Sequence, residues 1–210
     1  MKHLVIIGAR GWGREVYDIA KACISHGSDF DIKGFLDDKF DALDGYDNYP
    51  RILSSVEDYK VEIDDVFICA LGNVIYKHKY VQLLLDKGAQ FISLVHPTAI
   101  IGHNATIGVG CIIGAYAHIS CDTKLGDFVT FSVKAGMGHD SSVGKFSHIG
   151  GYTYISGFVT IEEFVTIHPC CDIIPHRKIG NNSTIGAGSV VIRNVKSNTT
   201  VFGNPAKLLP

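Results

Sequence analysis

A six-residue hydrophobic repeat is the feature that most constrains what this chain can fold into. From Ile101 to Val191 every sixth residue is apolar, over sixteen consecutive positions and without an insertion. A period of six does not follow the turn of about 3.6 residues of an α-helix, so the repeat excludes a helical domain. It predicts a triangular parallel β-helix, in which each hexapeptide forms one face and about 18 residues complete one coil.

Glycines and small residues keep the same period. The chain contains 23 glycines among 210 residues, and a small side chain stands two residues before most of the apolar positions. Glycine directly follows nine of the apolar positions, as Gly102, Gly108, Gly114, Gly126, Gly138, Gly144, Gly150, Gly180 and Gly186. We expect the aliphatic residues to stack into a continuous core, the small residues to fill the corners, and the glycines to permit the turns.

A glycine-rich turn near the N-terminus predicts a site for a phosphate group. An apolar run over residues 3–7 ends in Gly8-Ala9-Arg10-Gly11-Trp12-Gly13, and a helical pattern follows it. In such a strand–turn–helix unit, glycines let the backbone approach a phosphate, and the helix N-terminus presents free N–H groups to the anion. The first 95 residues are therefore predicted to form a small Rossmann-like βαβ domain, followed by the β-helix over residues 96–210.

Two further strands are expected to end at the same edge of this small sheet. A strand over residues 32–36 ends in Asp37-Asp38, and a strand over residues 66–71 ends in Gly72-Asn73. A helix over residues 76–87 and a strand over residues 91–95 complete the unit. The carboxyl ends of parallel strands form a ligand crevice, where an acidic residue can accept hydrogen bonds from ribose hydroxyls. The alternative interpretation is that these glycines only permit tight turns.

Composition excludes several classes of protein. Hydrophobic residues make up 46% of the chain and its formal charge is −2, which argues against a disordered chain and against an electrostatic nucleic-acid binder. No apolar run is long enough to insert into a membrane, and the N-terminus lacks the pattern of a secretory signal. None of the six cysteines has zinc-like spacing, so we expect no metal and reduced thiols in the cytoplasm, with Cys170-Cys171 as a weaker metal or redox alternative.

Several short motifs, taken in their order along the chain, resemble one family. They are the glycine-rich start, Gly34-Phe35-Leu36-Asp37-Asp38, Ala70-Leu71-Gly72-Asn73, His96-Pro97-Thr98-Ala99 and Gly203-Asn204-Pro205-Ala206-Lys207. With the repeat, they are similar to the bacterial sugar O-acyltransferases, a group that includes sialic acid O-acetyltransferases (NeuD-like) and PglD-like N-acetyltransferases acting on UDP-4-amino sugars. The resemblance implies a left-handed β-helix, acetyl-CoA as acyl donor, a nucleotide-linked sugar as acceptor, a homotrimer, and a role in bacterial surface polysaccharide or glycan biosynthesis.

The same resemblance implies the site residues. His139 is expected to be the general base and Asp140 the acid beside it, because a carboxylate stabilises the imidazolium formed during transfer. His148 is expected to contact the thioester, and Gly157, Pro169 and Ala187 to border the pantetheine arm. The nucleotide or sugar site is expected to comprise Gly8, Arg10, Gly11, Trp12, Asp37, Asp38, Gly72 and Asn73.

Geometry adds one observation about this region. Residues 18 apart stack in such a β-helix, so Asn104, Asp122 and Asp140 are predicted to form a polar column beside His103, Cys121 and His139. His168 and His176 match no site of the family and are interpreted as surface or loop histidines. Two positions depart from the family pattern: Trp12 stands where a histidine is common, and Gly138 stands where a larger residue is common.

Two other functions remain open at this point. An NAD(P)-linked oxidoreductase would need a complete six-stranded dinucleotide domain, for which the first half of the chain is short. A non-catalytic β-helix that binds a nucleotide sugar would be indifferent to the loss of His139. The repeat and the resemblance favour acetyl transfer over both, with the acceptor sugar and the choice between O- and N-acetylation undecided.

Overall fold

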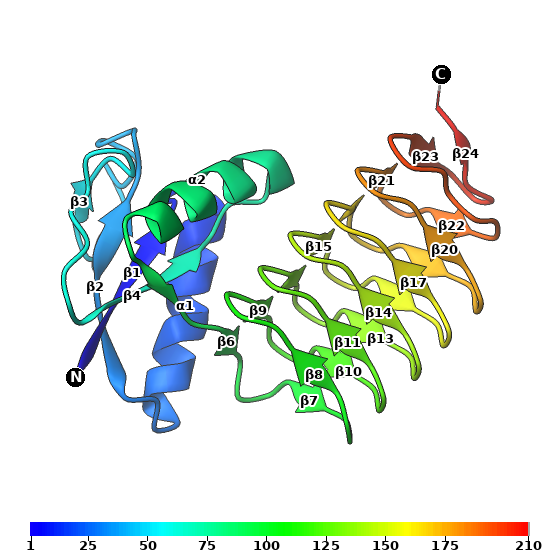
Figure 1. The fold of residues 1–210 in the computed structure, drawn as a ribbon, viewed down its shortest axis with the longest axis horizontal. Coiled ribbons are helices and arrows are strands. Elements are labelled where there is room, and N and C mark those ends of the chain that lie inside the picture. The colour runs from blue at the N-terminus through cyan, green and yellow to red at the C-terminus, as the bar shows by residue number, and fades with distance from the viewer. Residues whose placement is uncertain (210) are drawn as a thin grey trace. The chain divides into compact units, whose positions relative to one another are not determined.

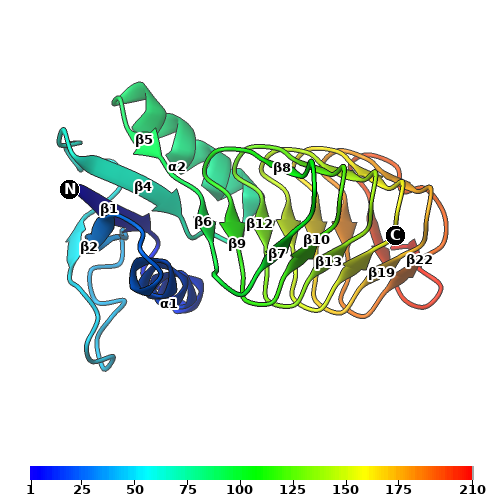
Figure 2. The same ribbon diagram turned by 90° about the horizontal axis from the view of Figure 1, so that it is seen from below.

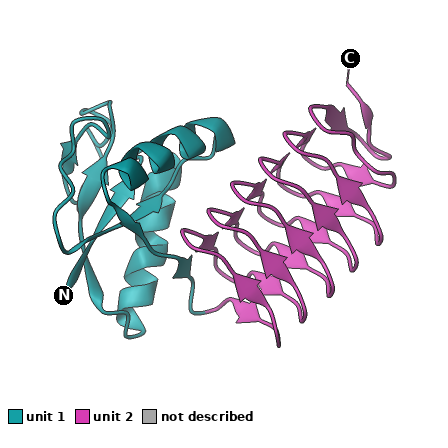
Figure 3. Cartoon of the chain, viewed as in Figure 1, with its two compact units in different colours: residues 1–97 teal, residues 98–210 magenta. Residues whose placement is uncertain are grey.

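The computed structural model describes residues 1–209. The chain divides into two compact units, Met1–Pro97 and Thr98–Pro210, coloured separately in Figure 3. The first unit mixes helices and strands, and the second is built from short strands alone. This is the predicted fold class, a small Rossmann-like α/β unit and a left-handed parallel β-helix.

The first unit is a five-stranded parallel sheet with the order β3-β2-β1-β4-β5 (Figure 1). The order reverses between β1 and β4, which creates a topological switch point at the carboxyl ends of these two strands. The elements of the unit are β1 (Lys2–Ile7), α1 (Gly11–Ser25), β2 (Phe30–Leu36), β3 (Ile52–Ser54), β4 (Asp65–Cys69), α2 (Val74–Asp86), β5 (Gln90–Phe91) and β6 (Leu94–Val95). The sheet has five strands, one fewer than the complete dinucleotide domain that the oxidoreductase alternative requires.

Two strand predictions for this unit need correction. The strand expected over residues 91–95 is divided into β5 and β6, and only β5 joins this sheet, because the chain turns away after Phe91. The backbone of β6 instead accepts a hydrogen bond at Val95 from the Cys23 thiol of α1, at 3.3 Å. β3 was not predicted, because three half-buried residues at a sheet edge carry too short a pattern.

The glycine turn of the first unit depends on a left-handed backbone conformation at one glycine and a close approach at another. Gly8 has a φ of +96°, in the left-handed region that favours glycine. A β-carbon on Gly13 would lie 2.0 Å from the carbonyl oxygen of Gly8, so only glycine allows α1 to start directly against the end of β1. Val16, Ile19 and Ala20 then bury the inner face of α1, as their spacing predicts.

The second unit is a β-helix with three parallel faces (Figure 2). The first face consists of β7 (Ile100–Ile101), β10 (His118–Ile119), β13 (Gly136–Met137), β16 (Tyr154–Ile155), β19 (Asp172–Ile173) and β22 (Val190–Val191). The second consists of β8 (Thr106–Ile107), β11 (Lys124–Leu125), β14 (Ser142–Val143), β17 (Thr160–Ile161) and β20 (Lys178–Ile179). The third contains β9 (Ile112–Ile113), β12 (Thr130–Phe131), β15 (His148–Ile149), β18 (Thr166–Ile167), β21 (Thr184–Ile185) and β23 (Thr200–Phe202), with β24 (Lys207–Leu208) antiparallel to β23.

The register of the strands confirms the 18-residue coil. Ile119 pairs with Met137, and Met137 pairs with Ile155. The inward residues of the repeat are buried from Ile113 to Val191, which forms the predicted core. Ile101 is an exception at 38% exposure, because β7 is the end strand of its sheet and no earlier coil of the repeat packs against it.

The role predicted for the repeat glycines is wrong. The left-handed turn positions are occupied mostly by other residues, such as Asp122, Asp140 and Phe158, and the nine glycines after the aliphatic positions do not have positive φ. A β-carbon on Gly102 would lie 2.5 Å from the backbone nitrogen of Cys121 in the next coil, and the other eight show equally close approaches. These glycines therefore permit close stacking of successive coils.

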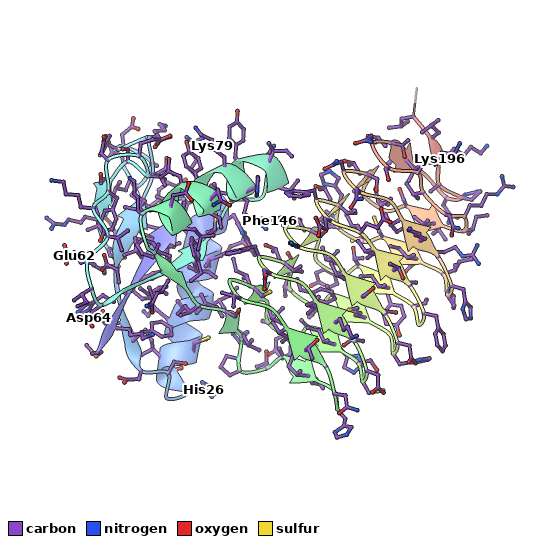
Figure 4. The ribbon with its side chains drawn as sticks, in the orientation of Figure 1. His26, Glu62, Asp64, Lys79, Phe146 and Lys196 are labelled. Atoms are coloured by element: carbon purple, nitrogen blue, oxygen red, sulfur yellow. The ribbon has the colours of Figure 1, made fainter. Side chains whose placement is uncertain are left out.

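Aromatic side chains occupy several of the strained turns. Phe128, Phe146 and Phe164 all have a φ near +58°, at 59°, 59° and 57°, and Phe146 is labelled in Figure 4. Their rings stack in a ladder, with centroids 4.9 Å and 5.2 Å apart and planes within 13° of parallel. Ring stacking of this kind offsets part of the cost of a left-handed backbone in a bulky residue.

Candidate active site

The first unit contains a pocket at the carboxyl ends of β1, β2 and β4, with a volume of about 480 Å³. It brings together seven of the eight predicted nucleotide or sugar residues, namely Gly8, Arg10, Trp12, Asp37, Asp38, Gly72 and Asn73. Gly11, the eighth, is the exposed first residue of α1 and does not line the pocket. The predicted crevice is thus present as a cavity of the size of a mononucleotide.

The two adjacent carboxylates at the end of β2 have different surroundings. Asp37 is buried and accepts hydrogen bonds from the backbone N–H groups of Ala9 and Lys39, both at 2.9 Å, which ties the glycine turn to the end of β2. Asp38 is exposed and accepts a hydrogen bond from the Tyr80 hydroxyl at 2.7 Å. That hydrogen bond, together with burial, raises the pKa of Tyr80 well above its usual value. Asp37 is therefore bound to the backbone of the fold, and Asp38 is the exposed carboxylate of the pocket.

The two helix N-termini at the pocket also differ. The side chain of Asn73 caps α2, because its oxygen accepts hydrogen bonds from the N–H groups of Ile75 and Tyr76 at 3.0 Å. α1 begins after Arg10, whose side chain makes no such cap. The first-turn N–H groups of a helix have no partner within the helix, and they attract an anion. The guanidinium of Arg10 lies 3.7 Å from Asp37, so the α1 end of the pocket combines a cation with helix N–H groups.

Sequence reasoning missed two aromatic residues of the pocket, Tyr76 and Tyr80. Both belong to α2, four residues apart, and positions i and i+4 share a helix face. That spacing was visible in the predicted helix and is the signal that could have found them. With Trp12, they surround the pocket with aromatic rings suited to stacking on a nucleobase.

In the second unit, His139 and Asp140 form a hydrogen-bonded pair at the turn after β13. Nδ1 of His139 lies 2.8 Å from an Oδ of Asp140, and the two side chains are 52% and 48% exposed. A carboxylate accepts the hydrogen bond, which assigns the ring proton to Nδ1 and leaves the lone pair on Nε2. The pair therefore leaves a basic nitrogen on a half-exposed imidazole, a group able to accept a proton.

The imidazole is held by the next coil. The ring lies over Gly157, where a β-carbon would come within 2.9 Å of Cε1 and 3.0 Å of Nε2. Its other contact is with Phe158, edge to face at a centroid distance of 5.1 Å. A β-carbon on Gly138 would lie 2.6 Å from the backbone nitrogen of Gly157. The larger residue that is common in the family at this position would therefore not fit against the next coil of this chain. The absence of side chains at both glycines positions His139.

The residues predicted to contact the donor lie in two places. Gly157 shares the His139 corner, whereas Pro169 and Ala187 are exposed one above the other at another corner of the coil, after β18 and β21. Gly188, the residue after Ala187, donates its N–H to the carbonyl of Pro169 at 3.0 Å and so connects the two coils. His148 is half-buried in β15, between Thr130 and Thr166 of the neighbouring strands. A single chain thus does not gather these residues into one cavity.

The predicted polar column is present. Nδ2 of Asn104 donates to an Oδ of Asp122 at 3.0 Å, and the N–H of Asp140 donates to the carbonyl of Cys121 at 3.4 Å. His176, interpreted from sequence as a surface or loop histidine, extends the same corner, because its ring stacks on Phe158 at 4.9 Å. Phe158 and His176 are 18 residues apart, which is one coil of the β-helix, so this contact could have been predicted from the sequence.

Two further expectations concern metals and membranes. Among residues 1–209, no three or more His, Cys, Asp and Glu side chains are grouped as a metal site would require. Cys170 is exposed and Cys171 buried, and both are free thiols. Within the same range no helix has the length and apolar character needed to cross a bilayer.

The fold and the site together define a class of protein. A parallel α/β unit followed by a hexapeptide-repeat β-helix is an organisation in which each unit matches a known family of domains. Residues 3–84 match the PglD N-terminal domain, and residues 158–193 match the bacterial transferase hexapeptide (six repeats). The chain is thus similar, in two separate regions, to the PglD-like sugar acetyltransferases.

Individual proteins and solved structures show the same similarity. The chain is 30% identical over 119 residues to UDP-N-acetylbacillosamine N-acetyltransferase of Bacillus subtilis, a match that covers 55% of the chain and 52%, about half, of that relative. It is 29% identical over 203 residues to GDP-perosamine N-acetyltransferase of Escherichia coli O157:H7, covering 94% of the chain and 81% of the relative. The acetyltransferase domain of PglB from Neisseria gonorrhoeae has a similar structure, with a TM-score of 0.89, 28% identity and full coverage of both chains.

Proposed function

We propose that this protein transfers an acetyl group from acetyl-CoA to the amino group of a nucleotide-linked sugar. The observation that carries the proposal is the exposed His139, whose Nδ1 is held by Asp140 at 2.8 Å. The family relatives named above are N-acetyltransferases of nucleotide-linked sugars, and the PglB domain has also been solved in complex with acetyl coenzyme A, at 27% identity and a TM-score of 0.88 over 99% of both chains. These names favour an amino acceptor over a hydroxyl.

The chemistry assigned to His139 is general base catalysis. Nε2 removes a proton from the acceptor amine as its nitrogen attacks the thioester carbonyl carbon. The new carbon–nitrogen bond replaces the carbon–sulfur bond, and the CoA thiolate leaves with the proton returned by the imidazolium. Asp140 stabilises that imidazolium while it exists, because opposite charges in contact favour the charged form.

The pocket of the first unit is the proposed acceptor site. Its α1 end, with Arg10 and the uncapped helix N-terminus, suits the diphosphate of a sugar nucleotide. Asp38, Trp12, Tyr76 and Tyr80 line the pocket. The proposed role of Asp38 is to accept hydrogen bonds from ribose hydroxyls, and that of the three aromatic rings is to stack on the base. Gly8, Gly72 and Asn73 shape the walls through their backbones.

The donor site is proposed to need more than one copy of the chain. His139 and Gly157 lie at one corner of the coil, and Pro169 and Ala187 lie at another. A second copy whose Pro169–Ala187 corner faces His139 would complete the site, with His148 contacting the thioester. Such an arrangement is what the homotrimer implied by the resemblance would provide. The biological setting proposed for the product is bacterial surface glycan synthesis.

The experiment that tests the proposal is acetyl transfer by the full chain and by His139→Ala. Acetyl-CoA would be offered with GDP-, UDP-, dTDP- and CMP-linked amino sugars, and product followed by free thiol release and by mass. Loss of a general base lowers kcat by about 10²–10⁴-fold. His168→Ala removes another exposed histidine of the same unit and serves as the matched control. A His139→Ala variant as active as the control would contradict the mechanism.

A further inference from the structure

Asn104, Asp122 and Asp140 occupy equivalent turn positions in three successive coils. Their φ values are 57°, 57° and 55°, so their side chains leave the backbone in the same direction. Parallel strands lie about 4.8 Å apart, which sets the step from one side chain to the next. Asp140 is the partner of His139, and Asp122 is the next carboxylate in the column. A second carboxylate therefore stands one coil from the His139–Asp140 pair.

Asp122 is kept both ionised and oriented by its neighbours. The hydrogen bond from the Asn104 amide and then that from the Cys121 thiol hold the pKa of Asp122 below its usual range, and His103 and His139 act in the same direction. The Asn104 contact, at 3.0 Å, limits the rotation of the carboxylate although the side chain is exposed. Asp122 is therefore a stationary negative charge at neutral pH.

The other titratable groups at this corner come from each coil that packs there. His103 and Cys121 lie on the coils before His139, and Asp140 lies on its own turn. On the following side, His176 stacks on Phe158, whose ring separates it from His139. Among these groups Asp140 and Asp122 are the carboxylates, and Asp140 alone contacts the imidazole directly.

We propose that Asp122 is a positioning residue for acetyl transfer, and that its carboxylate stabilises the positive charge that His139 gains when it accepts the proton of the acceptor. The inference rests on the proposed function of His139. Asp122 exchanges no proton and touches no substrate, because the proton passes from the acceptor to Nε2 and from there to the CoA thiolate. Interactions between exposed charges one coil apart are weak, so the effect on kcat is of the order of two- to fivefold.

The test is Asp122→Asn in the full chain. The amide keeps the size of the side chain and can still accept the hydrogen bond of Asn104. We expect kcat to fall about two- to fivefold and KM for acetyl-CoA to stay within about twofold, because only the charged state of the base is affected. The acidic limb of kcat against pH moves to lower pH. Asp172→Asn, which removes an equally exposed carboxylate of the same unit, leaves both unchanged.

A second measurement tests the role of Asp122 without any acceptor substrate. The Cε1 proton resonance of His139, followed by NMR against pH, should titrate at lower pH in Asp122→Asn than in the wild type, because the variant lacks a negative charge that favours the imidazolium. Asn104→Ala, which keeps the charge and removes its hydrogen bond, should give a smaller displacement. An unmoved midpoint, or wild-type kcat in Asp122→Asn, overturns the role of Asp122. An active His139→Ala contradicts the proposed function instead.

Discussion

Gly157 lies beneath the imidazole of His139, one coil further along the β-helix. A β-carbon there would approach Cε1 at 2.9 Å and Nε2 at 3.0 Å, which is closer than ordinary packing allows. The orientation of a surface histidine thus depends on a residue without a side chain, 18 positions away in the sequence. The geometry of the His139–Asp140 pair is consequently set by the stacking of coils as much as by the turn that carries it.

The variant Gly157→Ala is predicted to displace the ring of His139. Since the φ of Gly157 is not positive, alanine is tolerated by the backbone, and the added methyl group acts on the imidazole. We expect acetyl transfer to fall at least about tenfold, because misplacement of about 1 Å is costly in catalysis. Thermal unfolding of Gly157→Ala in wild-type and His139→Ala backgrounds supplies the control. An equal loss of stability in both backgrounds would show that the ring is not what the methyl group meets.

The variant Asp140→Asn tests the His–Asp hydrogen bond. An amide can present its N–H to Nδ1 and so place the ring proton on Nε2, which removes the lone pair from the position where the base needs it. We expect kcat to fall by at least about tenfold, with KM for acetyl-CoA little changed. Steady-state kinetics beside Asp172→Asn measures the effect. Equal rates for the two variants would remove Asp140 from the mechanism.

Asp37 and Asp38 are predicted to behave differently although they are adjacent. Asp37→Ala leaves the N–H groups of Ala9 and Lys39 without their acceptor, so the free energy of unfolding should fall by about 1–3 kcal/mol. Asp38→Ala removes an exposed side chain and should leave stability within about 0.5 kcal/mol. Its effect should be on KM for the nucleotide-linked acceptor. Denaturant unfolding and acceptor titration separate the two, and the reverse pattern would reassign both residues.

Asp65 predicts a pH dependence of the stability of the first unit. Burial raises its pKa, but hydrogen bonds from Lys33, the backbone of Glu62 and Tyr59 more than offset burial and place the pKa below the usual value. A carboxyl whose pKa is depressed on folding stabilises the fold above its unfolded pKa of about 3.9, and this stability is lost as the pH falls through the folded value.

The variant Asp65→Asn tests whether the ionised carboxylate of Asp65 stabilises the fold and whether this stability is lost as the pH falls. At pH 7 it should destabilise the chain by about 1–3 kcal/mol, because Lys33 loses its buried partner and keeps only the exposed carboxylate of Glu62. The difference from wild type should shrink as the pH falls below about 4. Denaturant unfolding at pH 7, 5 and 3.5 measures it. A difference that is constant over this range would mean that the ionised carboxylate is not what stabilises the fold.

Much of the pocket of the first unit follows from the order of local patterns in the sequence, but the roles of its residues do not. Parallel strands that end in Gly8, Asp37 and Gly72 must meet at one edge of the sheet, so their proximity could be predicted. Whether a carboxylate at that edge faces the ligand or the backbone depends on nearby N–H groups, which sequence does not position. Two backbone N–H groups donate hydrogen bonds to the carboxylate of Asp37, which is buried, whereas Asp38 is exposed to solvent.

The β-helix itself is determined by the sequence alone, because a strict period of six admits one way to bury every aliphatic residue and also specifies which residues stack. That stacking predicts the column of Asn104, Asp122 and Asp140. Only the tertiary structure decides what the glycines do and where His139 points. Both depend on distances of a few tenths of an ångström between successive coils, and a repeat specifies which residues are neighbours without specifying how closely their atoms approach.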